Sequence, residues 1–178
     1  MKKINLVVFL LMSYISVAQD VTIISGGSIT IPQDSYVFVG GDFTNTAGTV
    51  TLNSGSDDFS SLLVSGSASG NITYNRYVNI VGDGEWDLIG ALVIGLSINS
   101  FITETNNNAT IATNGDYYAV GSYDNTTDTW TNATESTGGN LELGQGYQIA
   151  TTGGGTLSFT GTIASGDQSV TINNNDAA

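Results

Sequence analysis

Apolar and polar residues alternate along most of this chain, in short runs separated by glycine and asparagine. Between residues 21 and 78, three triplets place two apolar residues around a threonine and start 21 and then 22 residues apart: Ile29-Thr30-Ile31, Val50-Thr51-Leu52 and Ile72-Thr73-Tyr74. Further apolar segments lie between them at 36–39 and 62–64. A repeat near this length is typical of a β-solenoid, in which each coil buries its inner residues against the next. Antiparallel hairpins would show the same alternation and remain the alternative.

From residue 72 onward the strand candidates become longer and carry more aromatic residues. They lie at 72–78, 85–89, 117–123, 129–132, 147–151, 156–160 and 168–172. Clusters of asparagine, glycine and aspartate separate them, and this spacing predicts an antiparallel β-sandwich. Threonine, valine, isoleucine and tyrosine suit strands, which agrees with a chain poor in helix formers.

Few segments depart from the strand pattern. Ser97 can cap a short helical turn over 97–101, and loops are expected at 105–108 and 134–140. The predicted fold class is therefore all-β. A β-solenoid-like stack rich in glycine, threonine and serine spans 19–71, a β-sandwich-like module spans 72–172, and a disordered tail follows at 173–178.

Residues 1–18 match a secretory signal peptide. Lys2 and Lys3 form the basic start, an apolar run follows, and Ser16-Val17-Ala18 supplies small residues for cleavage before Gln19. The apolar run is too short for a comfortable membrane span, although an uncleaved anchor is the alternative. We therefore expect a protein that is secreted or held on the outer cell surface, without stable membrane insertion after cleavage.

Charge excludes several classes of function. The whole chain has a formal net charge of −13, with 16 Asp and Glu residues, no His and no Cys. After the leader, Arg76 is the one remaining cation, so imidazole, thiolate and amine chemistry are missing from the mature chain. We therefore expect that the protein is not an enzyme. A glycosidase could work with carboxylates alone, but it would need two of them facing each other across a cleft. Nucleic acid and anionic lipid would be repelled.

An ordered series of segments resembles a known kind of module. The segments are 71–77, 85–90, 118–123 followed by Trp130, 143–148 and 159–163. Together they resemble the β-rich module of large exported proteins of the Bacteroidota, the cargo of the type IX secretion system, over about half of the chain. The resemblance implies a cell-surface protein. Such cargo generally ends in a C-terminal sorting domain, which this sequence lacks, so the chain resembles the front piece of a longer protein.

Three acidic residues alternate at one place in the sequence. In an extended segment Asp83, Glu85 and Asp87 would lie on one face of the strand, where an oxygen-rich cluster suits calcium. A solvated strand edge is the favoured alternative, because the cluster does not follow the spacing of a calcium-binding loop. We expect no cofactor, and at most weak and diffuse binding of calcium.

Aromatic residues and the lone cation provide the other candidates. Trp130 and Tyr123, beside the loop at 124–128, are candidate ligand-binding residues for stacking on sugars. Trp86 is predicted to lie in the core. Arg76 shares its strand parity with apolar positions, so its stem is predicted to pack inside beside Trp86, with Leu88 also inward, and to have a structural role.

These observations favour a non-catalytic, exported β-module that acts as a spacer or adhesion segment of a larger cell-surface protein. Surface glycans or other cell-surface proteins are the expected partners. The alternative is a carbohydrate-binding module that uses exposed Trp and Tyr side chains. Exposure of Trp130 beside tyrosine rings in one flat patch would favour the alternative.

Overall fold

The computed structural model describes residues 19–82, 86–167 and 169. The predicted signal peptide, the predicted tail at 173–178, Asp83 and Glu85 lie outside the described residues, as does most of the expected strand at 168–172. The described part is an all-β fold with two short helices, which confirms the predicted fold class. None of its helices is long and apolar enough to cross a membrane.

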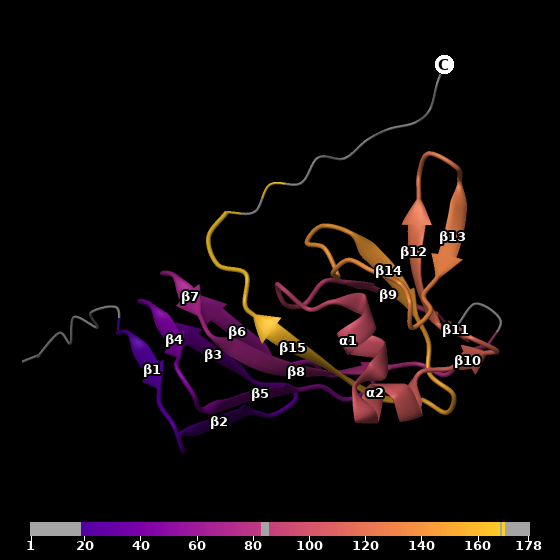
Figure 1. The fold of residues 1–178 in the computed structure, drawn as a ribbon. Helices are drawn as coiled ribbons and strands as arrows, with labels where there is room; N and C mark the ends of the chain where they lie inside the picture. Colours follow the sequence, from indigo (N-terminus) through magenta and orange to yellow (C-terminus); the bar gives the residue numbers. More distant parts are fainter. Residues whose placement is uncertain (1–18, 83–85, 168, 170–178) are drawn as a thin grey trace, which may run out of the picture.

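The first eight strands form a region that we call the stack. They are β1 (Val21–Ile23), β2 (Ser28–Ile31), β3 (Tyr36–Val39), β4 (Phe43–Asn45), β5 (Thr49–Asn53), β6 (Ser61–Val64), β7 (Ala68–Ser69) and β8 (Asn71–Val78). Strands of successive turns of the chain pair in parallel, as β1-β4-β7, β2-β5-β8 and β3-β6 (Figure 1). The antiparallel-hairpin alternative therefore does not describe these pairings.

The repeated triplets lie side by side in this arrangement. Thr30 is opposite Thr51, and Thr51 is opposite Thr73. Their apolar neighbours Ile31 and Leu52 are also paired, and both are buried in the interior. The spacing of 21 and 22 residues between triplets thus corresponds to one turn of the stack.

The corner between β7 and β8 requires a glycine. Gly70 has a φ of +80°, and a Cβ there would overlap the backbone carbonyl oxygen of Asn45. The Asn45 side chain braces the same corner: its Nδ2 donates to the carbonyl of Asn71 (2.6 Å), and its Oδ1 accepts from the amide of Gly48 (2.9 Å). Close backbone approach and a left-handed φ together select glycine.

The rest of the chain adds a second sheet, two helices and a returning strand. The elements are β9 (Asp87–Gly90), α1 (Ile98–Thr103), α2 (Thr105–Thr110), β10 (Thr113–Asn114), β11 (Tyr117–Tyr118), β12 (Val120–Asp124), β13 (Thr129–Asn132), β14 (Gly146–Ile149) and β15 (Gly155–Thr162). Four of them form the antiparallel sheet β13-β12-β14-β9. Figure 1 shows the β12–β13 hairpin projecting away from the stack.

Strand β15 joins the two parts of the fold. It pairs antiparallel with β8 along its whole length and so extends the sheet to β15-β8-β5-β2. The helices pack against it, and the rings of Phe101 and Phe159 lie 4.5 Å apart. The expected boundary between residues 71 and 72 falls at the start of β8, a strand whose two edges pair with β5 and β15.

The predicted helical cap at Ser97 is confirmed. Its Oγ accepts a hydrogen bond from the amide of Ser100 at 3.0 Å, at the first turn of α1. The prediction of a loop at 105–108 is wrong, because these residues belong to α2. Helix α2 begins where the Glu104 carboxylate accepts from the amide of Asn107 at 2.8 Å.

Burial of Asn107 explains this second helix, whose sequence has low helix propensity. Its Nδ2 donates to the carbonyls of Phe101 and Ser158, both at 2.9 Å, and its Oδ1 accepts from the amide of Ser158 at 2.7 Å. Tertiary hydrogen bonds to β15 thus stabilise a turn that local preference alone would leave irregular.

The predicted orientation of β9 is wrong at Leu88. The sequence predicts that Leu88 faces inward, but its side chain is 74% exposed, whereas Ile89 is 5% exposed. Ile89 is opposite the buried Tyr147 of β14, and residues opposite each other in an antiparallel pair share a face. The next residue of the strand therefore fills the core in place of Leu88.

Candidate functional site

The exposed aromatic pair lies on the β12–β13 hairpin. Tyr123 is directly opposite Trp130, and their ring centroids are 5.1 Å apart with the planes at 51°. Trp130 is 43% exposed and Tyr123 is 37% exposed. The two rings therefore contact each other and both face solvent, as predicted for Trp130, but they form a corner rather than a flat patch.

The pair belongs to a larger surface that we call the outer face. Gly121 is opposite Asn132 on one side and Gln148 on the other, and Gln148 is opposite Leu88. Because opposite residues share a face, these side chains lie on the same side of the sheet as Trp130 and Tyr123. The outer face thus has two aromatic rings near the hairpin, two amides in the middle and an exposed leucine on β9.

Gly121 brings the two amides together. A Cβ at this position would lie 2.8 Å from both the Oδ1 of Asn132 and the Nε2 of Gln148. Since glycine has no side chain, both amide groups can close over the backbone of β12. The middle of the outer face is therefore low and polar, beside the higher aromatic pair.

Two carboxylates shape the loop next to the aromatic pair. The Tyr123 hydroxyl donates to the Asp128 carboxylate, and this hydrogen bond raises the pKa of Tyr123 above its usual value. Asp124 accepts from the amide of Thr126 (2.8 Å) and the hydroxyl of Thr127 (3.0 Å), and these bonds lower the pKa of Asp124. The ring of Tyr123 is thus held at its polar tip as well as by Trp130.

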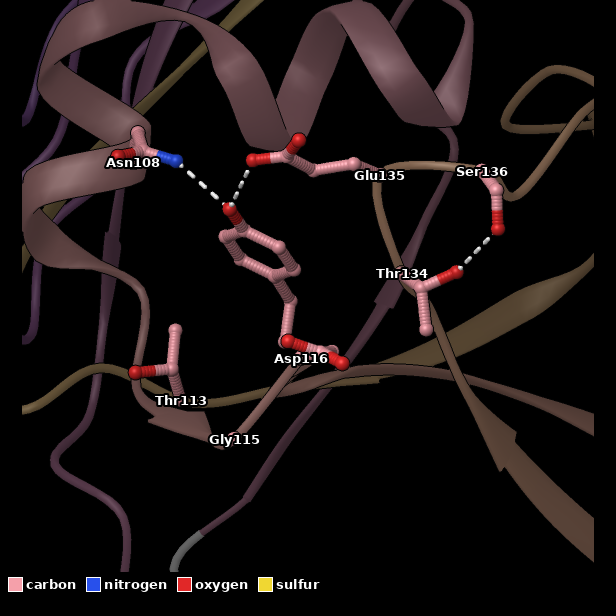
Figure 2. A pocket seen from close by; sticks show the side chains of 8 residues that line it. Asn108, Thr113, Gly115, Asp116, Thr134, Glu135 and Ser136 are labelled. Atoms are coloured by element: carbon pink, nitrogen blue, oxygen red, sulfur yellow. Dashed lines mark hydrogen bonds between the residues drawn. The ribbon is translucent and has the colours of Figure 1, made fainter.

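A separate polar cavity of about 660 Å³ lies near α2 and the β10–β11 hairpin. Its lining consists of Asn108, Thr113, Gly115, Asp116, Tyr118, Thr134, Glu135 and Ser136. The Tyr118 hydroxyl accepts from the Nδ2 of Asn108 (2.9 Å) and donates to the Glu135 carboxylate (3.1 Å), as Figure 2 shows. The lining has two carboxylates and no cation, so it suits a hydroxyl-rich or cationic group.

Sequence reasoning missed this cavity because its residues come from three separate segments. Asn108 is on α2, Asp116 is in the turn between β10 and β11, and Glu135 follows β13. The asparagine, threonine and acidic residues involved are common throughout the chain. No local motif distinguishes them from ordinary loop residues.

The acidic cluster can be located only in part, since Asp83 and Glu85 lie outside the described residues. Both oxygens of Asp87 accept hydrogen bonds from Asn79, one from its backbone amide (2.8 Å) and one from its Nδ2 (2.9 Å). Among the described residues, no group of three or more acidic residues could hold a metal ion. Asp87 thus fixes the segment that follows β8.

The aromatic partner of Arg76 differs from the prediction, whereas Trp86 does pack against the core, partly buried. The guanidinium carbon of Arg76 lies 3.8 Å from the centroid of the Phe59 ring, which replaces Trp86 as the aromatic partner. The half-buried Arg76 side chain lies on β8 and reaches the segment before β6, so its contact connects two turns of the stack.

Comparison of this chain with protein-family models, curated proteins and solved structures finds no match. What the outer face and the cavity do is therefore inferred from their residues and geometry.

Proposed function

We propose that this protein is a non-catalytic, exported module of a cell-surface protein, and that it binds carbohydrate on its outer face. The observation that carries this proposal is the contact between the exposed rings of Trp130 and Tyr123 on the projecting hairpin. Large aromatic rings left exposed on such an acidic, polar chain favour a binding role.

The chemistry of the outer face suits a sugar. The C–H faces of a pyranose ring stack on aromatic rings, while its hydroxyl groups need hydrogen-bond donors and acceptors nearby. The half-buried side-chain amide of Gln148 offers both kinds of group near the rings, whereas the Oδ1 of Asn132 is buried and has no hydrogen-bond partner among the described residues. Because the rings of Trp130 and Tyr123 are tilted by 51°, they fit a single flexible glycan chain better than the flat surface of a crystalline polysaccharide.

Other features support the surface-module part of the proposal. The predicted leader at residues 1–18 and the resemblance to type IX secretion cargo favour export. The stack of strands can act as a spacer that carries the binding hairpin at one end. A spacer or adhesion role follows from such an arrangement. The partner would then be a surface glycan of the same cell or of a neighbouring one.

A glycan-array screen followed by titration tests this function. The Trp130→Ala variant is expected to bind at least ~10-fold more weakly than the unmodified protein to any glycan that the screen finds. The Tyr117→Ala variant removes another exposed ring, outside the outer face, and is expected to bind normally. Equal binding by the unmodified protein and Trp130→Ala, or shortening of the glycan during incubation, would contradict the proposal.

A further inference from the structure

The last turn of the stack is paired with a further strand at one of its three sheets and hydrogen-bonded by Ser165 at a second. Strand β15 pairs with the far edge of β8, and the amide of Ala68 on β7 donates to the Oγ of Ser165 at 3.1 Å. The sheet β3-β6 has no such cover, because after β8 the chain runs to Ile80, which bridges to Thr151. Within the described ranges, no strand pairs with the second edge of β6.

The open edge of β6 presents regularly spaced backbone groups. The amide of Ser61 donates to the carbonyl of Ser35 (3.1 Å), and the amide of Ser65 donates to the carbonyl of Val39 (2.9 Å). Successive residues of a strand direct their backbone groups to opposite edges. Leu62 and Val64 therefore direct theirs away from β3, toward the position that a third strand would take.

The same sheet has an apolar outer surface. Tyr36, Phe38 and Leu63 each have more than half of their surface exposed, and Phe38 is directly opposite Leu63. In the neighbouring sheets the outward positions are threonine and serine, as in the aligned rows Thr30-Thr51-Thr73 and Thr22-Thr44-Ser69. Among the three sheets of the stack, the exposed large apolar side chains within strands thus lie on the sheet whose edge is open, which is where strand addition is expected.

A cation lies at the start of this edge. Arg76 stacks on Phe59, two residues before β6 begins, and is the one Lys or Arg that follows residue 18. Ser60, the residue between Phe59 and β6, is 96% buried, and its Oγ has no hydrogen-bond partner among the described residues. The Tyr74 hydroxyl donates a hydrogen bond to the Ser60 carbonyl at 3.2 Å. The beginning of the edge is therefore a fixed, positively charged point in a protein that is otherwise acidic.

We propose that an extended segment of a partner protein pairs with β6 as the third strand of this sheet. Main-chain hydrogen bonds to Leu62 and Val64 supply the pairing, and an apolar side chain of the segment packs on Leu63, which in turn is opposite Phe38. A carboxylate of the segment pairs with Arg76. A second copy of this chain is a poorer occupant, because two chains of net charge −13 repel each other.

Synthetic peptides test the proposal directly. The probe is a short peptide of alternating valine and threonine with one glutamate, placed at either end so that both strand directions are sampled. One of these two peptides is expected to bind the protein. Replacing its glutamate with glutamine is expected to weaken binding by about tenfold. Methylation of alternate backbone nitrogens on the pairing edge of the peptide is expected to abolish binding.

Two variants locate the binding. Leu63→Lys, on the outer surface of the open sheet, is expected to weaken peptide binding at least ~10-fold. Ile24→Lys changes another apolar residue with more than half of its surface exposed, at the first turn of the stack, and this variant is expected to bind the peptide normally. Circular dichroism checks that both variants fold. No binding of either peptide, or equal binding of the methylated peptide, overturns the proposal. The proposal is also overturned if the unmodified protein is a dimer and the Leu63→Lys variant is a monomer, because a second copy of the chain would then be the occupant.

Discussion

At the residue scale, buried polar side chains explain features that hydrophobic pattern does not. Asn107 is fully buried, yet its side-chain amide has partners on both α1 and β15. Satisfied buried amides stabilise a particular packing, whereas an unsatisfied backbone group in the same place is costly. One asparagine thus fixes how the helices sit on the returning strand.

Replacing Asn107 with leucine should therefore be strongly destabilising. The change keeps the size of the side chain but leaves the carbonyl of Phe101 and both backbone groups of Ser158 without partners. The free energy of unfolding is expected to fall by about 3 kcal/mol or more, measured by chemical denaturation. Asn106→Leu is the matched control, since its Nδ2 makes one exposed bond to Thr156, and it should cost less than ~1 kcal/mol. Equal losses would show that the buried network is not what holds α2.

A second residue-scale prediction concerns the aromatic pair. The carboxylate of Asp128 holds the Tyr123 hydroxyl in its protonated form, so the pKa of Tyr123 is raised. Asp128→Asn removes the charged acceptor, and the pKa of Tyr123 should fall toward that of free tyrosine. An NMR titration of the tyrosine ring signals measures this. An unchanged titration in Asp128→Asn would mean that the loop does not hold the ring.

At the element scale, the threonine-centred triplets predicted segments that do pair across the stack. Their regular spacing specifies which residues meet, because a shift of one residue would turn every inward side chain outward. The sequence does not determine which face of the segment at 86–89 is buried, because apolar residues occupy both strand parities: Trp86 and Leu88 on one and Ile89 on the other. Its orientation depends on Tyr147, 58 positions after Ile89, and only the folded sheet reveals that partner.

The corner glycine gives a prediction at the same scale. Gly70→Ala places a methyl group against the carbonyl of Asn45 and also strains a left-handed φ, so the loss of stability is expected to be roughly 3 kcal/mol or more. Gly95→Ala has a similar φ of +83° but open space around it, and should cost about 1 kcal/mol. Thermal or chemical denaturation of the two variants side by side measures the difference. Similar losses would indicate that the close approach at β7–β8 is absent.

At the scale of the whole molecule, charge is the dominant feature. The chain has a net charge of −13, and the described residues contain no built cage for a metal. Calcium is therefore expected to act by screening repulsion. It should raise Tm slightly, and by no more than sodium chloride at equal ionic strength. A large rise specific to calcium would reveal an ordered site.

The candidate sites differ in how far their residues could be predicted from the sequence. Trp130 and Tyr123 could be chosen as candidates because they flank one short loop in the sequence, and a hairpin makes them neighbours. The cavity around Tyr118 and the row from Asn132 to Leu88 could not, because their residues meet only after separate strands pair. The same is true of Arg76, whose aromatic partner Phe59 comes from the previous turn of the stack.

Mapping of NMR chemical shifts during titration with a glycan that binds tests the central claim most directly. We predict that the largest changes occur at the indole of Trp130, the ring of Tyr123 and the side-chain amides of Asn132 and Gln148. They should saturate together, while the glycan remains intact. Changes centred on Asp116 and Glu135 in the polar cavity, with the outer face unaffected, would contradict the account.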